Sequence, residues 1–330
     1  MYDPNVEISV IVPCYNEEDV LLLFYREVKN VLENTLKLSD YEICFIDDGS
    51  KDKTLEIVKK LSNDDSHVIF VSFTRNFGKE AGIYAGLKYS RGRYVVIMDA
   101  DLQDPPSMIP TMYSILNSGE YDSVAVCRTT RSGEPVIRSF FSRCFYSLIN
   151  KISSVEIKNG ARDFRMMNRK TVDHLIKVSE YNRFSKGLFQ FVGGKTYWLS
   201  YENKVRAAGT TKWSFWNLLH YAIDGIVNFS DAPLSISTAV GLFITLFSFI
   251  WVIVLIAKKI IIGNYNVSGW TSAVCIILFL GGVQLLSIGI IGQYISRIFL
   301  ETKNRPIFLV SETNASDDDT DEKDGVRHMG

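Results

Sequence analysis

Two long uncharged stretches near the C-terminus set the strongest limit on how this chain can fold. No Asp, Glu, Lys or Arg occurs between residues 232 and 257, or between residues 260 and 296. Each stretch is long enough for an apolar helix of about 20 residues to cross a bilayer. We therefore predict two transmembrane helices, at about 233–257 and 270–296, that follow a soluble domain.

The preceding 231 residues have the mixed composition of a globular domain. The first ten, MYDPNVEISV, show no basic region ahead of an apolar core, so they do not predict a signal peptide. The five cysteines lack C-x-x-C spacing, which favours reduced thiols over disulfides or zinc. A formal net charge of −1 argues against nucleic acid as a partner. We expect this domain to stay in the cytoplasm.

Short apolar runs alternate with helical stretches through this domain. The runs cover residues 7–12, 41–46, 67–73, 94–98 and 123–127. Strands and helices that alternate with short links predict an α/β fold with a doubly wound, Rossmann-like, mostly parallel sheet. The run at 94–98 is uncharged and predicts a buried strand near the centre of that sheet.

Polar residues follow directly where three of these strands end. They are Asn16 and Glu17, Asp47 and Asp48, and Asp99 and Asp101. In open α/β sheets the ligand crevice lies at the carboxyl ends of the strands. Two carboxylates two residues apart can hold Mg²⁺ or Mn²⁺ together with substrate phosphates, although a simple turn that caps the next helix would also fit. No G-x-G-x-x-G or G-x-x-x-x-G-K-[ST] motif supports a dinucleotide or P-loop site.

Two further stretches combine bulky aromatic residues with helical spacing. Residues 136–152 place apolar side chains at intervals of three and four, with basic residues between them. This pattern fits a core-facing helix and a helix on a membrane surface equally well. Residues 213–229 repeat the pattern just before the first uncharged run, and there we favour an interfacial helix.

Four motifs at the strand ends carry a resemblance to a known family. They read PCYNE at 13–17, DDGSKDKT at 47–54, RNFGKEAGIYAG at 75–86 and DADLQDPP at 99–106. Together they resemble family 2 glycosyltransferases with a GT-A fold. Within that family the chain resembles polyprenyl-phosphate glycosyltransferases, which include bactoprenol glucosyltransferases and dolichol-phosphate mannose synthases. The segments at 162–170, 182–194 and 205–230 and the two uncharged runs agree with this.

The resemblance implies a nucleotide-sugar pocket at the carboxyl edge of the sheet. It assigns donor binding to Pro13, Tyr15, Glu17, Asp47, Asp48, Lys79, Asp99 and Arg128. It also implies that Asp99, Asp101 and Gln103 hold Mg²⁺ or Mn²⁺, and that Asp99, Asp101 and Asp163 are catalytic. A tyrosine in such a pocket offers a stacking face, and acids can accept hydrogen bonds from a base or ribose.

A lipid phosphate that approaches an anionic donor needs cations to offset the repulsion. Arg138, Arg206 and Lys212 lie in segments where the resembled family binds the acceptor phosphate. Arginine suits bidentate phosphate contacts, whereas an ordinary surface charge is the alternative for each of these residues. The sequence RAAGTTKW at 206–213 departs from the usual family pattern, which leaves the lipid side less defined.

The implied reaction is the inverting transfer of one hexose from a UDP-sugar to undecaprenyl phosphate at the cytoplasmic face of a bacterial membrane. Glucose is favoured, while N-acetylglucosamine, galactose and mannose stay open. A processive polysaccharide synthase would need more spans and a Q-x-x-R-W motif, and a non-catalytic scaffold would be expected to lose the 99–103 cluster. The resemblance further implies a homo-oligomer, a tetramer, with a flippase and an outer-face transferase as functional partners.

The domain prediction follows from these assignments. It comprises a catalytic domain at 1–212, an amphipathic juxtamembrane helix at 213–231, a transmembrane domain at 232–300 and a cytoplasmic tail at 301–330. In the tail, PIFLV at 306–310 is β-prone and precedes an acidic stretch that predicts disorder. Because an unpaired strand edge is unfavourable, we expect 306–310 to pair with a neighbouring subunit.

Asp163 holds the position that the resembled family gives to a catalytic acid near the anomeric carbon. A general base is needed when the nucleophile must lose a proton. Here the nucleophile would be a phosphate monoester with a second pKa of roughly 6, which is mostly a dianion at neutral pH. We therefore expect Asp163 to position Arg165 or another cation, or to stabilise positive charge at the anomeric carbon.

Overall fold

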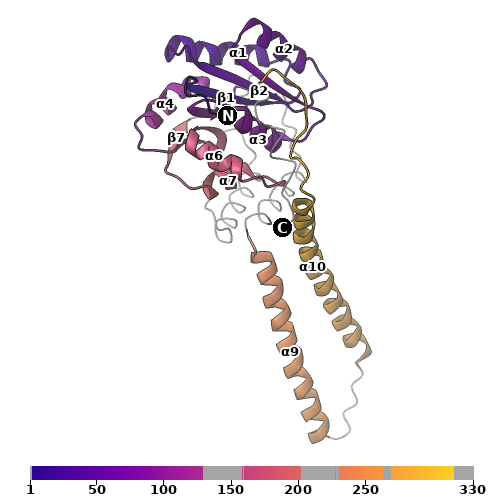
Figure 1. The fold of residues 1–330 in the computed structure, drawn as a ribbon. Helices are drawn as coiled ribbons and strands as arrows, with labels where there is room; N and C mark the ends of the chain where they lie inside the picture. The colour runs from indigo at the N-terminus through magenta and orange to yellow at the C-terminus, as the bar shows by residue number, and fades with distance from the viewer. Residues whose placement is uncertain are drawn as a thin grey trace, which may run out of the picture.

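Figure 1 shows an α/β domain from which a pair of long helices extends. The chain is described here from a computed structural model, which covers residues 2–128, 158, 160–201, 227, 230–262 and 269–315. The predicted surface helix at 136–152 lies outside these residues, and so does the one at 213–229 except for residue 227. The predicted combination of an α/β domain with two long apolar helices is confirmed.

The described strands form one eight-stranded mixed sheet in the order β7-β5-β6-β4-β1-β2-β3-β8. Strands β1, β2, β3 and β4 run parallel to one another, whereas β6 and β8 pair antiparallel with their neighbours. The mostly parallel centre agrees with the sequence prediction. The strands are β1 (Ile8–Cys14), β2 (Tyr41–Asp47), β3 (Val68–Phe73), β4 (Tyr94–Ile97), β5 (Ser123–Arg128), β6 (Ala161–Asn168), β7 (Thr196–Tyr201) and β8 (Val310–Thr313).

Helices cover both faces of this sheet, because its central strands carry apolar side chains on both sides. Side chains from α1, α2 and α4 form one core with Ile8, Val10 and Val12 of β1. Ile11 points to the other face, where α3, α6 and α7 pack. The helices are α1 (Leu21–Asn30), α2 (Thr54–Asp64), α3 (Lys79–Tyr89), α4 (Ile109–Asn117), α6 (Arg169–Lys177) and α7 (Ser185–Phe191), with a π-helical turn at Val31–Thr35 and a 3₁₀ turn at Pro106–Met108.

Helix α3 lies unusually close to β1. A Cβ atom on Gly86 would stand 2.1 Å from Cγ2 of Ile11, and one on Gly82 would stand 3.3 Å from Cβ of Pro13. Glycine at these two positions therefore permits the close approach of helix and strand. As a result, the first residue of α3, Lys79, starts at the carboxyl edge of the sheet, near the end of β1.

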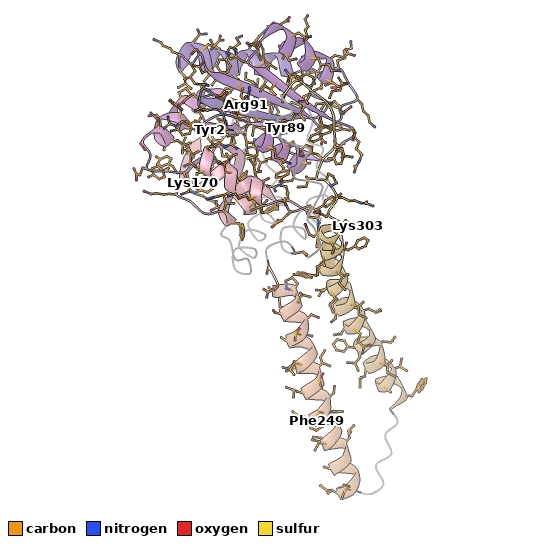
Figure 2. The ribbon with its side chains drawn as sticks, viewed as in Figure 1. Tyr2, Tyr89, Arg91, Lys170, Phe249 and Lys303 are labelled. Atoms are coloured by element: carbon orange, nitrogen blue, oxygen red, sulfur yellow. The ribbon has the colours of Figure 1, made fainter. Side chains whose placement is uncertain are left out.

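Two long helices, α9 (Ala232–Ile262) and α10 (Trp270–Thr302), extend side by side from the domain (Figure 1). Ser237 Oγ donates a hydrogen bond to Ser287 Oγ across the pair, at 2.9 Å. Large apolar side chains stay exposed, with Phe243 70% and Leu285 72% accessible. In Figure 2, Phe249 lies on α9 far from the sheet, and Lys303 lies at the end of α10 next to the domain.

The apolar segments of these helices are long enough to cross a membrane. They run from Ala232 to Leu255 and from Ile276 to Thr302, so the second ends later in the chain than predicted. A helix of 33 residues, such as α10, is about 50 Å long, which exceeds the roughly 30 Å of a bilayer core. The exposure of so much apolar surface is what a lipid environment, rather than water, would accommodate.

The C-terminal tail folds back on the domain of its own chain. Strand β8 pairs antiparallel with the edge strand β3, with Val71 opposite Thr313. Phe308 stacks on Phe73 with ring centroids 5.0 Å apart. The prediction that this segment pairs with a neighbouring subunit is wrong about the partner, because the edge of β3 within the same chain is within its reach.

The close packing of α3 on β1 gives a stability prediction. Gly86→Ala gains about 1 kcal/mol of helix propensity but forces a methyl group against the buried side chain of Ile11. Overpacking of a core costs about 1–3 kcal/mol, and the 2.1 Å approach places this site at the upper end of that range, so we expect a net loss of about 2 kcal/mol in the free energy of unfolding. Denaturant titration of the detergent-solubilised protein measures it.

A double-mutant cycle provides the control for that prediction. In the Ile11→Ala background, where the opposing side chain is truncated, Gly86→Ala should cost less than it does alone. Equal costs in both backgrounds would show that the contact with Ile11 is not the cause.

Candidate active site

A pocket of about 350 Å³ opens at the carboxyl edge of the sheet, where β1, β2 and β4 end. This edge is the place where an open α/β sheet binds its ligand. The pocket collects seven of the predicted site residues from four separate segments. Its lining consists of Pro13, Cys14, Tyr15, Glu17, Asp48, Asn76, Gly78, Lys79, Asp99, Ala100 and Asp101.

The loop before α3 is fixed to the end of β2 by Asp48. Its carboxylate accepts hydrogen bonds from the backbone N–H groups of Phe77, at 2.6 Å, and Gly78, at 2.9 Å. Burial raises the pKa of Asp48, although these two N–H groups favour its ionised form. Next to it, Gly49 has a φ of +64°, and a Cβ there would lie 2.5 Å from the carbonyl carbon of Arg75. The loop can therefore sit directly against this turn.

Lys79 joins two acids that are far apart in the sequence. Its Nζ lies 2.7 Å from Oδ1 of Asp99 and 2.7 Å from Oδ2 of Asp163. Burial alone would raise the pKa of Asp163, but the Lys79 ammonium outweighs that effect and holds this pKa well below its ordinary value. Burial would lower the pKa of Lys79, but the two carboxylates raise it instead. The Lys79 ammonium therefore lies between side-chain oxygens of Asp99 and Asp163.

In the DADLQ turn, Asp99 and Asp101 line the pocket, whereas Gln103 does not. Asp101 Oδ1 accepts a hydrogen bond from the backbone N–H of Gln103 at 3.1 Å, and Leu102 between them has a φ of +54°. Asp101 lines the pocket, whereas Gln103 is buried and accepts a hydrogen bond from Nη2 of Arg162 at 3.0 Å. The predicted metal set is therefore only partly assembled, since Gln103 is not among the pocket residues.

The pocket nevertheless has donors that suit a divalent cation. Asp99 and Asp101 both line it, and no group of three or more His, Cys, Asp or Glu side chains with metal-binding geometry occurs among the described residues. Two carboxylates are enough for Mg²⁺ or Mn²⁺ when phosphates of a substrate complete the coordination. The donor set fits such a metal only in combination with a phosphorylated ligand.

Asp47 does not reach the pocket. Its Oδ1 accepts from the backbone N–H of Ser50 at 3.1 Å, and its Oδ2 accepts from Oγ of Ser72 at 2.7 Å. Only 1% of the residue is exposed, so its contacts are those of a structural residue at the end of β2. Sequence position alone could not separate it from Asp48, the adjacent acid that does line the pocket.

The structure describes few of the predicted basic side chains. Arg128 is the last residue of β5, but its side chain is not described, and Arg138, Arg206 and Lys212 lie outside the described residues. Arg165 is buried, with its guanidinium carbon 3.5 Å from the ring centre of Phe189. Burial lowers its pKa. Asp163 forms its ion pair with Lys79, so Lys79 is the cation that Asp163 holds in place.

Four pocket residues were not among the predicted site residues: Cys14, Asn76, Gly78 and Ala100. All four lie inside motifs quoted from the sequence, PCYNE, RNFGKEAGIYAG and DADLQDPP, so the signal was present. Glu80 was also missed, although its carboxylate accepts a hydrogen bond from the backbone N–H of Ser185 at 3.0 Å and so ties α3 to α7. Nothing local to the sequence indicates that contact.

A mixed, mostly parallel sheet with an acidic pair at its carboxyl edge is the arrangement of a GT-A glycosyltransferase. The sequence matches the glycosyl transferase family 2 over residues 9–176, and the chain belongs to this family. The predicted family membership and enzyme class are thereby confirmed.

Similar proteins match along nearly the full length of the chain. The bactoprenol glucosyl transferase of Shigella phage SfX is 42% identical, over 92% of this chain and 99% of its own. A prophage bactoprenol glucosyl transferase homolog of Escherichia coli (strain K12) is 41% identical, over 92% and 98%. CsbB of Bacillus subtilis (strain 168), a glycosyltransferase by assignment, is 43% identical, over 98% and 96%.

The double ion pair of Lys79 gives a prediction about pH and stability. Because the pKa of Asp163 is depressed in the folded protein, its pairing stabilises the fold above the unfolded value of about 4 and loses this effect as pH falls through the folded value. Lys79→Met should therefore lower the melting temperature most near pH 7, and the difference should shrink below about pH 4. Differential scanning fluorimetry across pH measures it.

Lys195→Met serves as the control, since Lys195 pairs with Glu120 on the exposed surface, with side chains 59% and 60% accessible. Exposed pairs contribute little to stability, so this variant should melt close to the wild type at each pH. A Lys79→Met difference that is the same at pH 3 and pH 7 would contradict the role given to the Lys79–Asp163 pair.

Proposed function

We propose that this protein transfers a single glucosyl residue from UDP-glucose to undecaprenyl phosphate, with inversion at the anomeric carbon. The product is a polyprenyl-phosphate glucose that serves cell-envelope glycan modification. The observation that carries the proposal is the identity of about 40% with bactoprenol glucosyl transferases, which extends over 92% of the chain and so includes both apolar helices. The pocket at the sheet edge supplies the chemistry expected of such an enzyme.

The donor's nucleoside diphosphate would bind in the pocket at the ends of β1 and β4. Tyr15, which is exposed, offers a ring for stacking, and Glu17 and Asp48 offer hydrogen-bond acceptors. Asp99 and Asp101 would hold the divalent metal, which when bound neutralises charge developing on the leaving diphosphate. Lys79 brings a further positive charge to the same pocket. Electrostatic stabilisation of this kind is usually the largest catalytic contribution.

Asp163 would act as a carboxylate throughout. Lys79 depresses its pKa, and a carboxylate with a depressed pKa is a weak base. The acceptor phosphate needs no base, since its second pKa of roughly 6 leaves it mostly a dianion at neutral pH. The role that fits both facts is to hold Lys79 in the pocket and to stabilise positive charge at the anomeric carbon.

The chain would work at the cytoplasmic face of a bacterial membrane. Both long apolar helices would cross the bilayer, so that the α/β domain and the tail lie on one side, as pairing of β8 with β3 requires. Arg297, Lys303 and Arg305 favour the cytoplasm for that side. A homo-oligomer, a flippase and an outer-face transferase would complete the system, because the product forms inside and is used outside.

The identity of the sugar is tested by incubating membranes that contain the protein with radiolabelled UDP-glucose, UDP-galactose or UDP-N-acetylglucosamine, and separating the lipid extract by thin-layer chromatography. We expect label in a lipid fraction only with UDP-glucose. Label from another UDP-sugar would keep the enzyme class and change the donor. Label in a long polymer would instead indicate a processive synthase.

Metal dependence is the next prediction. EDTA should abolish transfer, and Mg²⁺ or Mn²⁺ should restore it. The reason is that Asp99 and Asp101 line the pocket, while no group of three or more metal-binding side chains occurs among the described residues, so the protein alone would hold the metal weakly. Asp101→Ala should lower turnover by about 100-fold or more. The exposed Asp64 at the end of α2 provides the matched control, and Asp64→Ala should keep full activity. Full activity in EDTA would refute the metal assignment.

The role of Asp163 can be separated from that of a general base by pH profiles. If the acceptor phosphate's own ionisation supplies the acid limb, that limb should stay near pH 6 in Asp163→Asn, with the whole curve lowered. If Asp163 were the base, its acid limb should vanish in the variant. The comparison uses kcat/KM for the acceptor between pH 5 and pH 8.

A further inference from the structure

A short stretch of the tail follows the end of α10 that lies next to the α/β domain, and it leads toward the donor pocket. Helix α10 ends at Thr302, and the four residues 303–306 separate it from Ile307. A chain spans at most about 3.5 Å per residue, so the end of α10 is tethered closely to whatever Ile307 contacts. Ile307 lines a pocket together with the loop that precedes Lys79.

Three successive tail residues lie beside this loop or beside Phe73, the last residue of β3 before it. Ile307 lines a second pocket, of about 320 Å³, together with residues 75–78 of the loop. Phe308 stacks on Phe73, and Phe73 in turn meets the ring of Phe77 edge-on at 5.8 Å. The carbonyl of Leu309 accepts a hydrogen bond from the backbone N–H of Thr74 at 3.0 Å. The loop is thus held between Asp48 on one side and the tail on the other.

The same helix end reaches the neighbourhood of Lys79 by a second route. Glu301 of α10 accepts a hydrogen bond from the backbone N–H of Tyr181 at 2.8 Å. Four residues further on, the backbone N–H of Ser185 donates to Glu80, the residue that follows Lys79. Two independent sets of contacts therefore lead from the last turn of α10 to residues on either side of Lys79.

We propose that residues 307–309 act as a clasp that positions the loop 74–79, and with it Lys79, for donor binding when α10 is seated on the α/β domain. Phe308 is the main positioning residue, because its ring fills the space between Phe73 and Tyr84 on the face of the sheet that carries α3. The clasp links the membrane anchor to the donor pocket. It rests on the proposed function only in that the pocket binds a nucleotide-sugar.

If the tail only covered the edge of β3, loss of the Phe308 ring would leave the loop 74–79 unchanged. Pairing of β8 with β3 and the side-chain hydrogen bonds of Asn314 with Phe70 and Val68 cover the edge further along the strand. Loss of the Phe308 ring leaves those contacts in place. An effect of Phe308 on the loop is therefore separable from an effect on the edge.

The test compares Phe308→Ala with Leu309→Ala in the full-length protein in detergent. Leu309 is the adjacent residue, its side chain is largely exposed, and its backbone carbonyl is kept in the variant. Hydrogen exchange at the amides of Phe77 and Gly78 should become about three- to ten-fold faster in Phe308→Ala, and UDP should bind more weakly by a similar factor. This is the effect expected when the aromatic contact between Phe308 and Phe73 is lost. Leu309→Ala should match the wild type in both measurements.

Kinetics give a second readout that general destabilisation would not produce. In Phe308→Ala the KM for the donor should rise while the KM for the acceptor stays near the wild-type value, and Phe308→Leu, which keeps an apolar side chain, should recover most of the loss. If Phe308→Ala does not fold, Phe308→Leu is compared with Leu309→Ala by the same exchange measurement, with a smaller increase expected. Failure of the wild type to bind UDP would count against the proposed donor, not against the clasp.

The proposal is overturned if exchange at Phe77 and Gly78 is unchanged in folded Phe308→Ala. It is equally overturned if Leu309→Ala has the same effect as Phe308→Ala, since the ring would then have no special role. Glu301→Ala, which removes the acceptor oxygen, tests the second route and should speed exchange in residues 181–185 more than in residues 75–78.

Discussion

The site depends on one ammonium group held between two carboxylates. Nζ of Lys79 lies 2.7 Å from oxygens of Asp99, which follows β4, and Asp163, which lies in β6. Burial alone would raise the pKa of Asp163, and the Lys79 ammonium instead holds that pKa well below its ordinary value, so Asp163 stays ionised. The same ammonium lies against Asp99, which lines the pocket. The position of Lys79 is therefore what the surrounding structure must secure.

Several features of the fold secure that position. Gly82 and Gly86 let α3 approach β1, which brings the start of the helix to the edge of the sheet. Asp48 holds the preceding loop through two backbone N–H groups, and the adjacent Gly49 allows the loop to pass close by. Each of these contacts joins segments that meet only in the folded chain. Their common effect is a loop with little freedom next to the pocket.

The tail extends the same arrangement toward the membrane. Glycosyl transfer to a lipid requires a water-soluble donor and a membrane-bound acceptor to meet at one place. Here four residues separate the last apolar helix from Ile307, which lines a pocket together with the loop that precedes Lys79. The antiparallel pairing of β8 with β3 also removes an exposed strand edge, which would otherwise invite association with other chains.

The sequence by itself determined the α/β class, the positions of β1 to β5 and the two apolar helices, because these follow from local periodicity and charge. Its motifs at the strand ends contain most of the residues that line the pocket, whereas β6 and β7 were not predicted. It also determined the family. The tertiary structure decided which acid of a pair faces the pocket: Asp48 does, while Asp47 bonds to Ser50 and Ser72, and Gln103 turns to Arg162. It decided that Lys79 joins acids 20 and 84 positions away, and that the tail completes its own sheet. Such contacts depend on how separate segments pack, and no local pattern encodes them.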